Sequence, residues 1–180
     1  MVNFGIIGAG WRSEFYLRMA TLVPEEFNIT GIFIRNREKK KEFRNKYSVK
    51  IVDSTEELIM TNPDFIVSCV NNDGICDRIT ELANKNIPVL SETPIGTSSE
   101  QTENFKKRIK PHWKVQVAEQ FHFMPRNQAI KEVIDSGIIG EVNYAELSCC
   151  HDYHAVSLIR YFLGIKDEMP KVTSFSFDDK

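Results

Sequence analysis

The sequence has few cysteines, no long apolar run and no excess of charge of one sign. Its four cysteines form no CxxC pair, which argues against a disulfide scaffold and favours a reducing, cytoplasmic compartment. No apolar stretch approaches the length of a membrane span, and the first residues lack the pattern of a signal peptide. A net charge of −2 gives no electrostatic basis for binding nucleic acid. We therefore expect a globular protein without nucleic-acid or membrane partners.

Short apolar runs alternate with amphipathic segments over the first two thirds of the chain. The segments between the runs repeat their apolar residues at helical spacing. The expected strands are Val2–Gly8, Asn28–Ile34, Val49–Val52, Asp64–Val70, Ile87–Leu90 and Lys114–Ala118. Strands separated by helices indicate βαβ units, so the sequence predicts an α/β fold with a doubly wound parallel sheet of the Rossmann type.

The pattern changes after residue 119. A helix around residues 129–134 is followed by a strand at Glu141–Cys150, and a helix around 155–162 is followed by an alternating strand at 172–177. We therefore predict a Rossmann domain over residues 1–119. Residues 120–180 are then part of an α+β domain.

The opening stretch "NFGIIGAGWRSEF" predicts a site for a pyrophosphate. Gly8 allows a tight turn after the first strand, and Gly10 has no side chain to obstruct an anion. The helix that begins near Trp11 directs its free N–H groups toward the same place. Ser13 replaces the third glycine of the usual pattern, and Arg12 adds a cation. The alternative is a plain turn between strand and helix.

The end of the second strand predicts which cofactor is preferred. An acidic residue there would bind the ribose 2′-OH of NAD, but this chain has Arg35 followed by Asn36. An arginine suits a 2′-phosphate, so the preferred cofactor is NADP(H), with NAD(H) possible. The alternative is that Arg35 only begins a charged helix.

Two other polar stretches are candidates for binding sites. Asn71 and Asn72 follow the fourth strand, at the sheet edge where ligands bind, although they could equally be turn residues. The stretch "CCHDYH" at residues 149–154 concentrates groups that can bind metals. Because neighbouring residues on a strand point to opposite faces, Cys149 and Cys150 cannot easily bind one ion, and no metal is predicted.

Several stretches together resemble one family, the glucose–fructose oxidoreductase, inositol dehydrogenase and MocA family of NAD(P)-dependent dehydrogenases. The similarity extends over essentially the whole chain, and its segments occur in the order that the family has. The segments are "GIIGAGWRSEF", "IRNREKKKEF", "STEELI", "PDFIVSCVNN", "IPVLSETPIG", "EQFHFMP", "SGIIGEV" and "HDYHAVSLIRYFLG".

The resemblance also implies site residues, with two departures. The family has Glu-Lys-Pro where this chain has Glu92-Thr93-Pro94, so Thr93 replaces a catalytic lysine. The family's His-x-x-Asp pair corresponds to His154 and Ser157, so the aspartate is also replaced. Gln120 lies where the family places a residue near the substrate. With Glu92 and Thr93, it would line the nicotinamide side.

The expected activity is hydride transfer to or from a sugar, a polyol or a related small hydroxy or carbonyl compound. This reaction needs a base for the hydroxyl proton, and His154 is the leading candidate, with His151, His122 and Tyr153 as alternatives. Two other functions stay open. One is an NAD-dependent glycosidase, and the other is a dinucleotide-binding protein without catalytic activity.

The resemblance implies a second domain that is shortened in this chain. Only about 60 residues follow the nucleotide-binding part, enough for a helix or two and two strands. A strand at 172–177 would then be an edge with unpaired N–H and C=O groups. We expect homo-oligomers that form through this edge.

Overall fold

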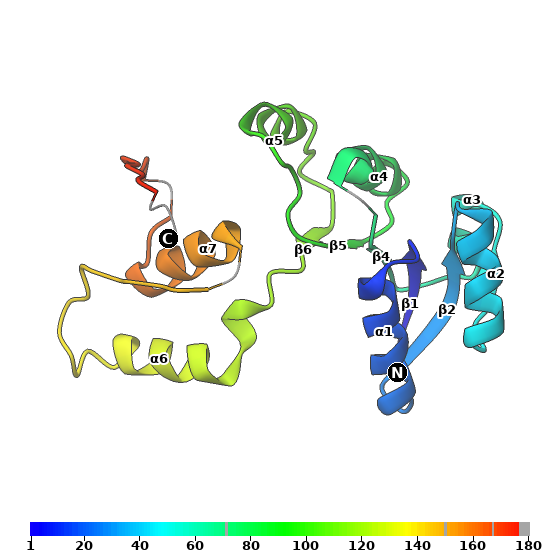
Figure 1. The fold of residues 1–180 in the computed structure, drawn as a ribbon, viewed down its shortest axis with the longest axis horizontal. Helices are drawn as coiled ribbons and strands as arrows, with labels where there is room; N and C mark the ends of the chain where they lie inside the picture. The colour runs from blue at the N-terminus through cyan, green and yellow to red at the C-terminus, as the bar shows by residue number, and fades with distance from the viewer. Residues whose placement is uncertain (71, 150, 167, 177–180) are drawn as a thin grey trace. The chain divides into compact units, whose positions relative to one another are not determined.

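The computed structural model describes residues 1–70, 72–149, 151–166 and 168–176 (Figure 1). The chain divides into two compact units, Met1–Ala118 and Glu119–Lys180. None of the described helices has the length and apolar character needed to cross a lipid bilayer.

The first unit is built on a sheet of six strands. In chain order they are β1 (Val2–Ile7), β2 (Phe27–Phe33), β3 (Ile51–Val52), β4 (Phe65–Ser68), β5 (Val89–Ser91) and β6 (Val115–Val117). Their order in the sheet is β3-β2-β1-β4-β5-β6, and every pairing is parallel. The predicted Rossmann-type α/β fold is therefore confirmed. The strand order reverses between β1 and β4, and ligands bind at such switch points in open α/β sheets.

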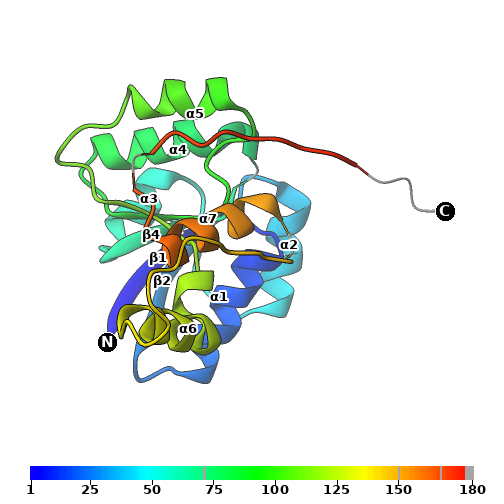
Figure 2. The ribbon, with the colours of Figure 1, turned by 90° about the vertical axis from the view of Figure 1, so that its left-hand side faces the viewer.

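Helices cover both faces of this sheet. On one face, α1 (Trp11–Leu22) and α2 (Arg37–Lys46) contribute Leu17 and Phe43 to a buried cluster. On the other face lie α3 (Thr55–Met60), α4 (Asn72–Asn84) and α5 (Ser99–Lys106). Figures 1 and 2 show α4 and α5 side by side. Ile6 and Ile7 of β1 belong to different clusters because successive strand residues point to opposite faces.

Leu58 of α3 packs against two strands at once. Ser54 begins α3 as its N-cap, accepting a hydrogen bond from the Glu57 backbone N–H at 3.0 Å. Leu58 is fully buried and lies over Gly5 of β1 and Gly31 of β2, where a Cβ would come within 3.0 Å and 3.2 Å of its side chain. The two glycines therefore make room for α3 on the sheet.

The second unit contains the short 3₁₀ helix η1 (Phe121–Phe123) and two longer helices, α6 (Pro125–Asp135) and α7 (Asp152–Leu163). Pro125 occupies the first turn of α6, where its missing N–H costs no hydrogen bond. Gly164 ends α7 in the left-handed conformation, with a φ of 67°. Both η1 and α6 contact α7.

The two strands predicted for this unit are wrong for the residues that the structure describes. Residues 141–149 and 172–176 form no strand, while Cys150 and Phe177 lie outside the described residues. A strand requires a partner that completes its ladder of hydrogen bonds, and none is present among the described residues of this unit. The alternating pattern at 172–176 therefore remains exposed, with Val172 and Phe175 facing solvent.

We predict that Leu58→Ala lowers the free energy of unfolding by about 2–5 kcal/mol, because it leaves a cavity between α3 and the two glycines. Met60→Ala, at an exposed position of the same helix, should change it by less than about 0.5 kcal/mol. Urea denaturation followed by circular dichroism measures both. Equal effects of the two substitutions would contradict this packing.

Candidate functional site

The loop after β1 is held against the backbone of the segment after β4. Gly8 has a φ of +125°, and a Cβ at this position would lie 2.3 Å from the carbonyl oxygen of Cys69. No side chain can be accommodated there, and the backbone conformation itself favours glycine. Gly8 thus holds the loop directly at the switch point of the sheet.

The N-terminus of α1 is open to an anion. Gly10 is the N-cap residue, and no side chain caps the first turn. No atom lies within 4 Å of the position that a Cβ of Gly10 would take, so the space in front of the helix is empty. The first N–H groups of a helix and its positive dipole end favour a phosphate. The loop therefore fits the pyrophosphate of a dinucleotide, and Ser13 is fully buried beneath it.

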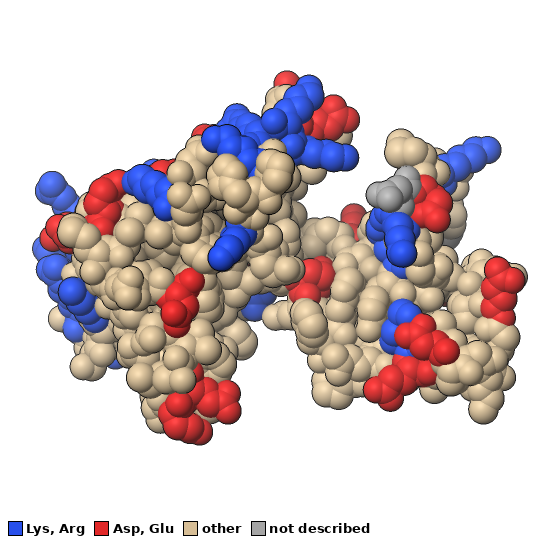
Figure 3. Space-filling view, turned by 180° about the vertical axis from the view of Figure 1, so that it is seen from behind, with Lys and Arg blue, Asp and Glu red and all other residues tan. Residues whose placement is uncertain are grey.

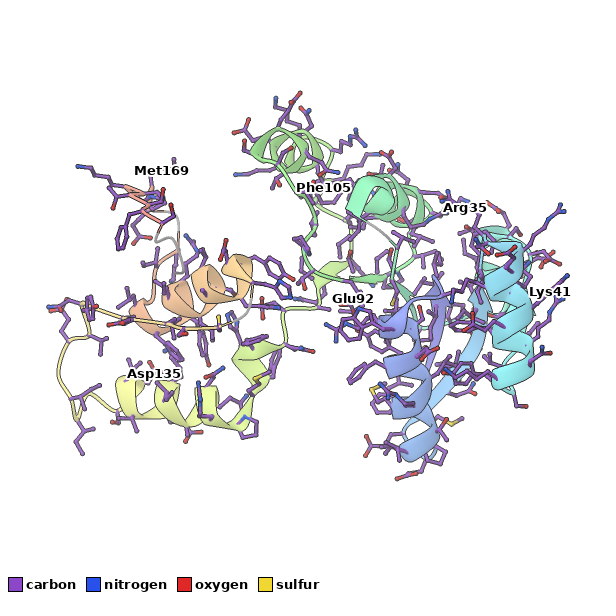
Figure 4. The ribbon with its side chains drawn as sticks, in the orientation of Figure 1. Arg35, Lys41, Glu92, Phe105, Asp135 and Met169 are labelled. Carbon is purple, nitrogen blue, oxygen red and sulfur yellow. The ribbon has the colours of Figure 1, made fainter. Side chains whose placement is uncertain are left out.

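Glu92 connects the end of β5 to α1. Its carboxylate accepts a hydrogen bond from the Tyr16 hydroxyl at 2.8 Å and forms an ion pair with Arg12 Nε at 2.8 Å. The Arg12 guanidinium also lies 4.6 Å from the ring centroid of Trp11, which is 71% exposed. Glu92 itself is buried at the carboxyl end of the sheet (Figure 4). The Arg12 side chain is therefore held at the start of α1 by an ion pair through its Nε, next to the loop after β1.

Burial shifts the pKa values of two groups near Glu92. Burial, followed by the Glu92 carboxylate, raises the pKa of Tyr16 well above its usual range, so its hydroxyl remains a hydrogen-bond donor. The same two causes raise the pKa of the Cys69 thiol to about 12. Both groups are therefore neutral near pH 7.

Arg35 and Asn36 lie at the other end of the expected dinucleotide site, between β2 and α2. Arg35 is exposed, and within the described part of the chain its side chain has no ion-pair partner. It is labelled in Figure 4. Asn36 is the N-cap of α2, and its side-chain oxygen accepts from the N–H groups of Glu38 and Lys39. The surface in Figure 3 carries basic and acidic side chains on the same face.

Three further predicted site residues lie in the described part of the chain: Thr93, Asn72 and Gln120. Thr93 is half-buried, and the Thr93–Pro94 peptide is cis. Asn72 is the first residue of α4, and Asn71 lies outside the described residues. Gln120 belongs to the second unit, where it is exposed and directly precedes η1.

His154 is paired with a carboxylate that precedes η1. Its Nδ1 lies 2.7 Å from Glu119 Oε2, and the other oxygen of Glu119 accepts from the Phe121 N–H at 2.9 Å. The Phe121 ring stacks on the imidazole, with centroids 4.1 Å apart, and His154 is buried. Because an ionised carboxylate only accepts, the proton lies on Nδ1, and Nε2 is the basic nitrogen.

A second pair, His122 and Ser157, connects η1 with α7. His122 Nε2 lies 2.9 Å from Ser157 Oγ, and the His122 ring stacks on Tyr161 with centroids 4.4 Å apart. The position where the resemblance places an aspartate therefore interacts with His122. Glu119 supplies the carboxylate for His154.

No group of three or more His, Cys, Asp and Glu side chains in the described segments is arranged to hold a metal ion. Cys150, part of the "CCHDYH" stretch, lies outside those segments.

Residues 2–121 match the family described as the oxidoreductase family with an NAD-binding Rossmann fold, GFO/IDH/MocA. The chain belongs to this family. No curated protein is found to match the sequence.

Solved structures share the family's fold at low sequence identity. Scyllo-inositol dehydrogenase of Lactobacillus casei, solved with NAD(H) and scyllo-inositol, aligns with a TM-score of 0.75 and 17% identity over 91% of this chain and 56% of that one. Myo-inositol 2-dehydrogenase of Lactobacillus plantarum gives 0.74 and 19% over 91% and 56%. An oxidoreductase of Agrobacterium radiobacter, with NAD+, L-tartaric acid and magnesium, gives 0.73 and 17% over 91% and 55%. The chain thus spans about half the length of these proteins, and the likeness shows the fold.

Two residues of this family member were missed by sequence reasoning. Tyr16 fits the apolar repeat of α1, and this pattern gives no sign that its hydroxyl donates a hydrogen bond to Glu92. Glu119 offered a signal, because an acidic residue directly follows the expected sixth strand, at the edge where α/β sheets bind ligands. Its pairing with a histidine 35 residues later required the tertiary structure.

We predict that Cys69 resists alkylation. The thiolate is the reactive form, and a pKa of about 12 leaves about one thousandfold less of it at pH 8 than a pKa near 9 would. The rate with iodoacetamide should rise about tenfold per pH unit above pH 8, measured by peptide mass spectrometry. In concentrated urea Cys69 should react as an ordinary cysteine. Equal rates in the native and the unfolded chain would contradict the buried environment.

Proposed function

We propose that this chain carries the dinucleotide site and the proton-transfer histidine of an NADP(H)-dependent oxidoreductase acting on a CH–OH group. The observation that carries the proposal is the buried pair of His154 and Glu119. Oxidation of an alcohol by hydride transfer requires a base for the hydroxyl proton, and a histidine fixed in one tautomer by a carboxylate suits this task.

His154 would take the proton on Nε2 in the oxidative direction and return it in the other. Glu119 would hold Nδ1–H and stabilise the imidazolium that forms, while its bond from the Phe121 N–H keeps the carboxylate in place. The nicotinamide, when bound, supplies the hydride acceptor or donor. Thr93 would donate a hydrogen bond on the nicotinamide side, next to Glu92, but it lacks the positive charge of the lysine that the resemblance implies. Gln120 of the second unit remains a candidate.

The cofactor would bind along the carboxyl edge of the sheet. The backbone of Gly8, Gly10 and Trp11 would hold the pyrophosphate, and Arg35 with Asn36 would hold the adenosine end. We favour NADP(H) because Arg35 is exposed and unpaired in the described chain, so its guanidinium can bind a 2′-phosphate. Asn71 and Asn72 remain candidates for the nicotinamide side.

For the substrate we propose a sugar, a polyol or a related small hydroxy or carbonyl compound. One structural neighbour was solved with scyllo-inositol and another with L-tartaric acid, and both compounds carry several hydroxyl groups. We also propose a homo-oligomer, because the second unit exposes several large apolar side chains, among them Ile138, Val172 and Phe175.

A catalytically silent dinucleotide-binding protein is the second candidate function. Thr93 replaces the lysine of the family, and this specific observation favours it. Binding of the cofactor without turnover on sugars and polyols would support this alternative.

The cofactor proposal predicts tight binding of NADPH. Titration with NADPH should quench the fluorescence of Trp11 through energy transfer, with binding of NADH at least about tenfold weaker. Arg35→Asp should reverse this preference, because it removes the cation and adds a partner for a ribose hydroxyl. Gly10→Val should abolish binding of both. Equal affinity of the wild-type chain for both cofactors would remove the role of Arg35.

The proton-transfer proposal predicts a loss of turnover without a loss of cofactor. His154→Asn should reduce kcat about 10²–10⁴-fold, and Glu119→Gln should reduce it less while shifting the pH profile. NADPH affinity should stay within about twofold in both variants. Stopped-flow measurement of NADPH formation with a panel of polyols tests this. Unchanged kcat in His154→Asn would refute the assignment.

A further inference from the structure

A pocket in the second unit lies beside the His122–Ser157 pair and has no role in the proposed hydride transfer. It has a volume of about 340 Å³ and is open to solvent. Its walls come from η1, α7 and the turn after α7. The lining residues are His122, Ser157, Arg160, Tyr161, Gly164, Ile165 and Lys166.

Hydrogen-bond donors and cations dominate the polar lining of this pocket. Neither the Arg160 guanidinium nor the Lys166 ammonium forms an ion pair with any described residue. The Tyr161 hydroxyl has no partner among the described residues either, while its ring contacts both the His122 ring and the Lys131 ammonium. The carboxylate of Glu168 accepts from the Lys166 backbone N–H at 2.7 Å. The positive charge of the pocket lining therefore comes mainly from Arg160.

The hydrogen bonds of His122 leave the Ser157 hydroxyl as a further donor in the pocket. Its Nε2 contacts both the Ser157 hydroxyl at 2.9 Å and the Ser157 backbone carbonyl at 3.3 Å. A carbonyl only accepts, so both contacts are satisfied together when Nε2 carries the proton. The Ser157 oxygen then accepts from His122, and its own proton is left for a ligand.

We propose that this pocket binds an anionic group of the substrate, a carboxylate or a phosphate. Arg160 would pair with two of its oxygens, and Ser157 and Tyr161 would donate to the same group. This inference rests on the proposed function, because it names the class of hydroxy compound as a sugar acid or a sugar phosphate.

The spacing of the named residues along α7 fits a sugar acid or a sugar phosphate as the substrate. Ser157 and Arg160 lie three and six residues after His154, which is about 4.5 Å and 9 Å along a helix. His154 and Ser157, and likewise Ser157 and Arg160, are three residues apart and therefore neighbours on the surface of α7. A substrate of five or six carbons could therefore place its anionic end near Arg160 while one of its hydroxyl groups lies at His154.

The first test is an NMR titration of the histidine ring signals of the full chain with gluconate, glucose 6-phosphate and the neutral polyol glucitol. Gluconate or glucose 6-phosphate, but not glucitol, should shift the signals of His122. The compound that acts at the lower concentration identifies the anion as a carboxylate or a phosphate. Equal shifts with glucitol, or no shift with either anion, would overturn the inference.

Substitutions test whether anion binding depends on this pocket or on the overall charge of the surface. Arg160→Gln should weaken binding of the effective anion about tenfold or more, because it removes a charge-assisted hydrogen-bond donor. Arg126→Gln on α6 makes the same charge change outside the pocket and should leave the affinity unchanged. Lys166→Gln serves as a second variant if Arg160→Gln alters the remaining histidine signals. Equal affinity of the wild-type chain and both pocket variants would overturn the inference.

NADPH titration of the same samples distinguishes the two proposals. If NADPH binds and drives turnover while the anions leave His122 unaffected, the anion pocket is wrong and the proposed function stands. If the anions bind at His122 but no cofactor binds, the proposed function is wrong and the pocket is an anion site without that reaction.

Discussion

The close approach of Gly8 to the backbone of Cys69 sets the position of the loop between β1 and α1. A Cβ at Gly8 would lie 2.3 Å from the carbonyl oxygen of Cys69. Only glycine lets the loop after β1 pass this close to the end of β4 while keeping a positive φ. Because the loop is held there, α1 begins at the switch point of the sheet, and no side chain caps its N-terminus.

Next to this loop, the charged side chain of Arg12 has a structural role. Arg12 looks like a phosphate ligand in the sequence, yet its guanidinium is paired with Glu92. A buried carboxylate without a partner would be costly, and Arg12 together with the Tyr16 hydroxyl satisfies it. The backbone N–H groups at the start of α1 carry no net charge, and the helix sets their direction.

The second unit uses one helix and one short segment to orient two histidines. Glu119 and His122 lie three residues apart around η1, and His154 and Ser157 lie three residues apart on α7. Each element thus provides one histidine and one partner for the histidine of the other. Where the resemblance implies an aspartate, Ser157 pairs with His122, and the imidazole of His154 pairs with the carboxylate of Glu119.

The sequence alone determined the elements that depend on local pattern. The six parallel strands and the glycines of the first loop follow from apolar periodicity and from backbone preferences over a few residues. Partners distant along the chain were decided only by the tertiary structure. Glu119 meets His154, and Tyr16 meets Glu92, through packing that no local pattern records. The expected strands at 141–149 and 172–176 failed for the same reason, since a strand exists only where another strand completes its hydrogen bonds.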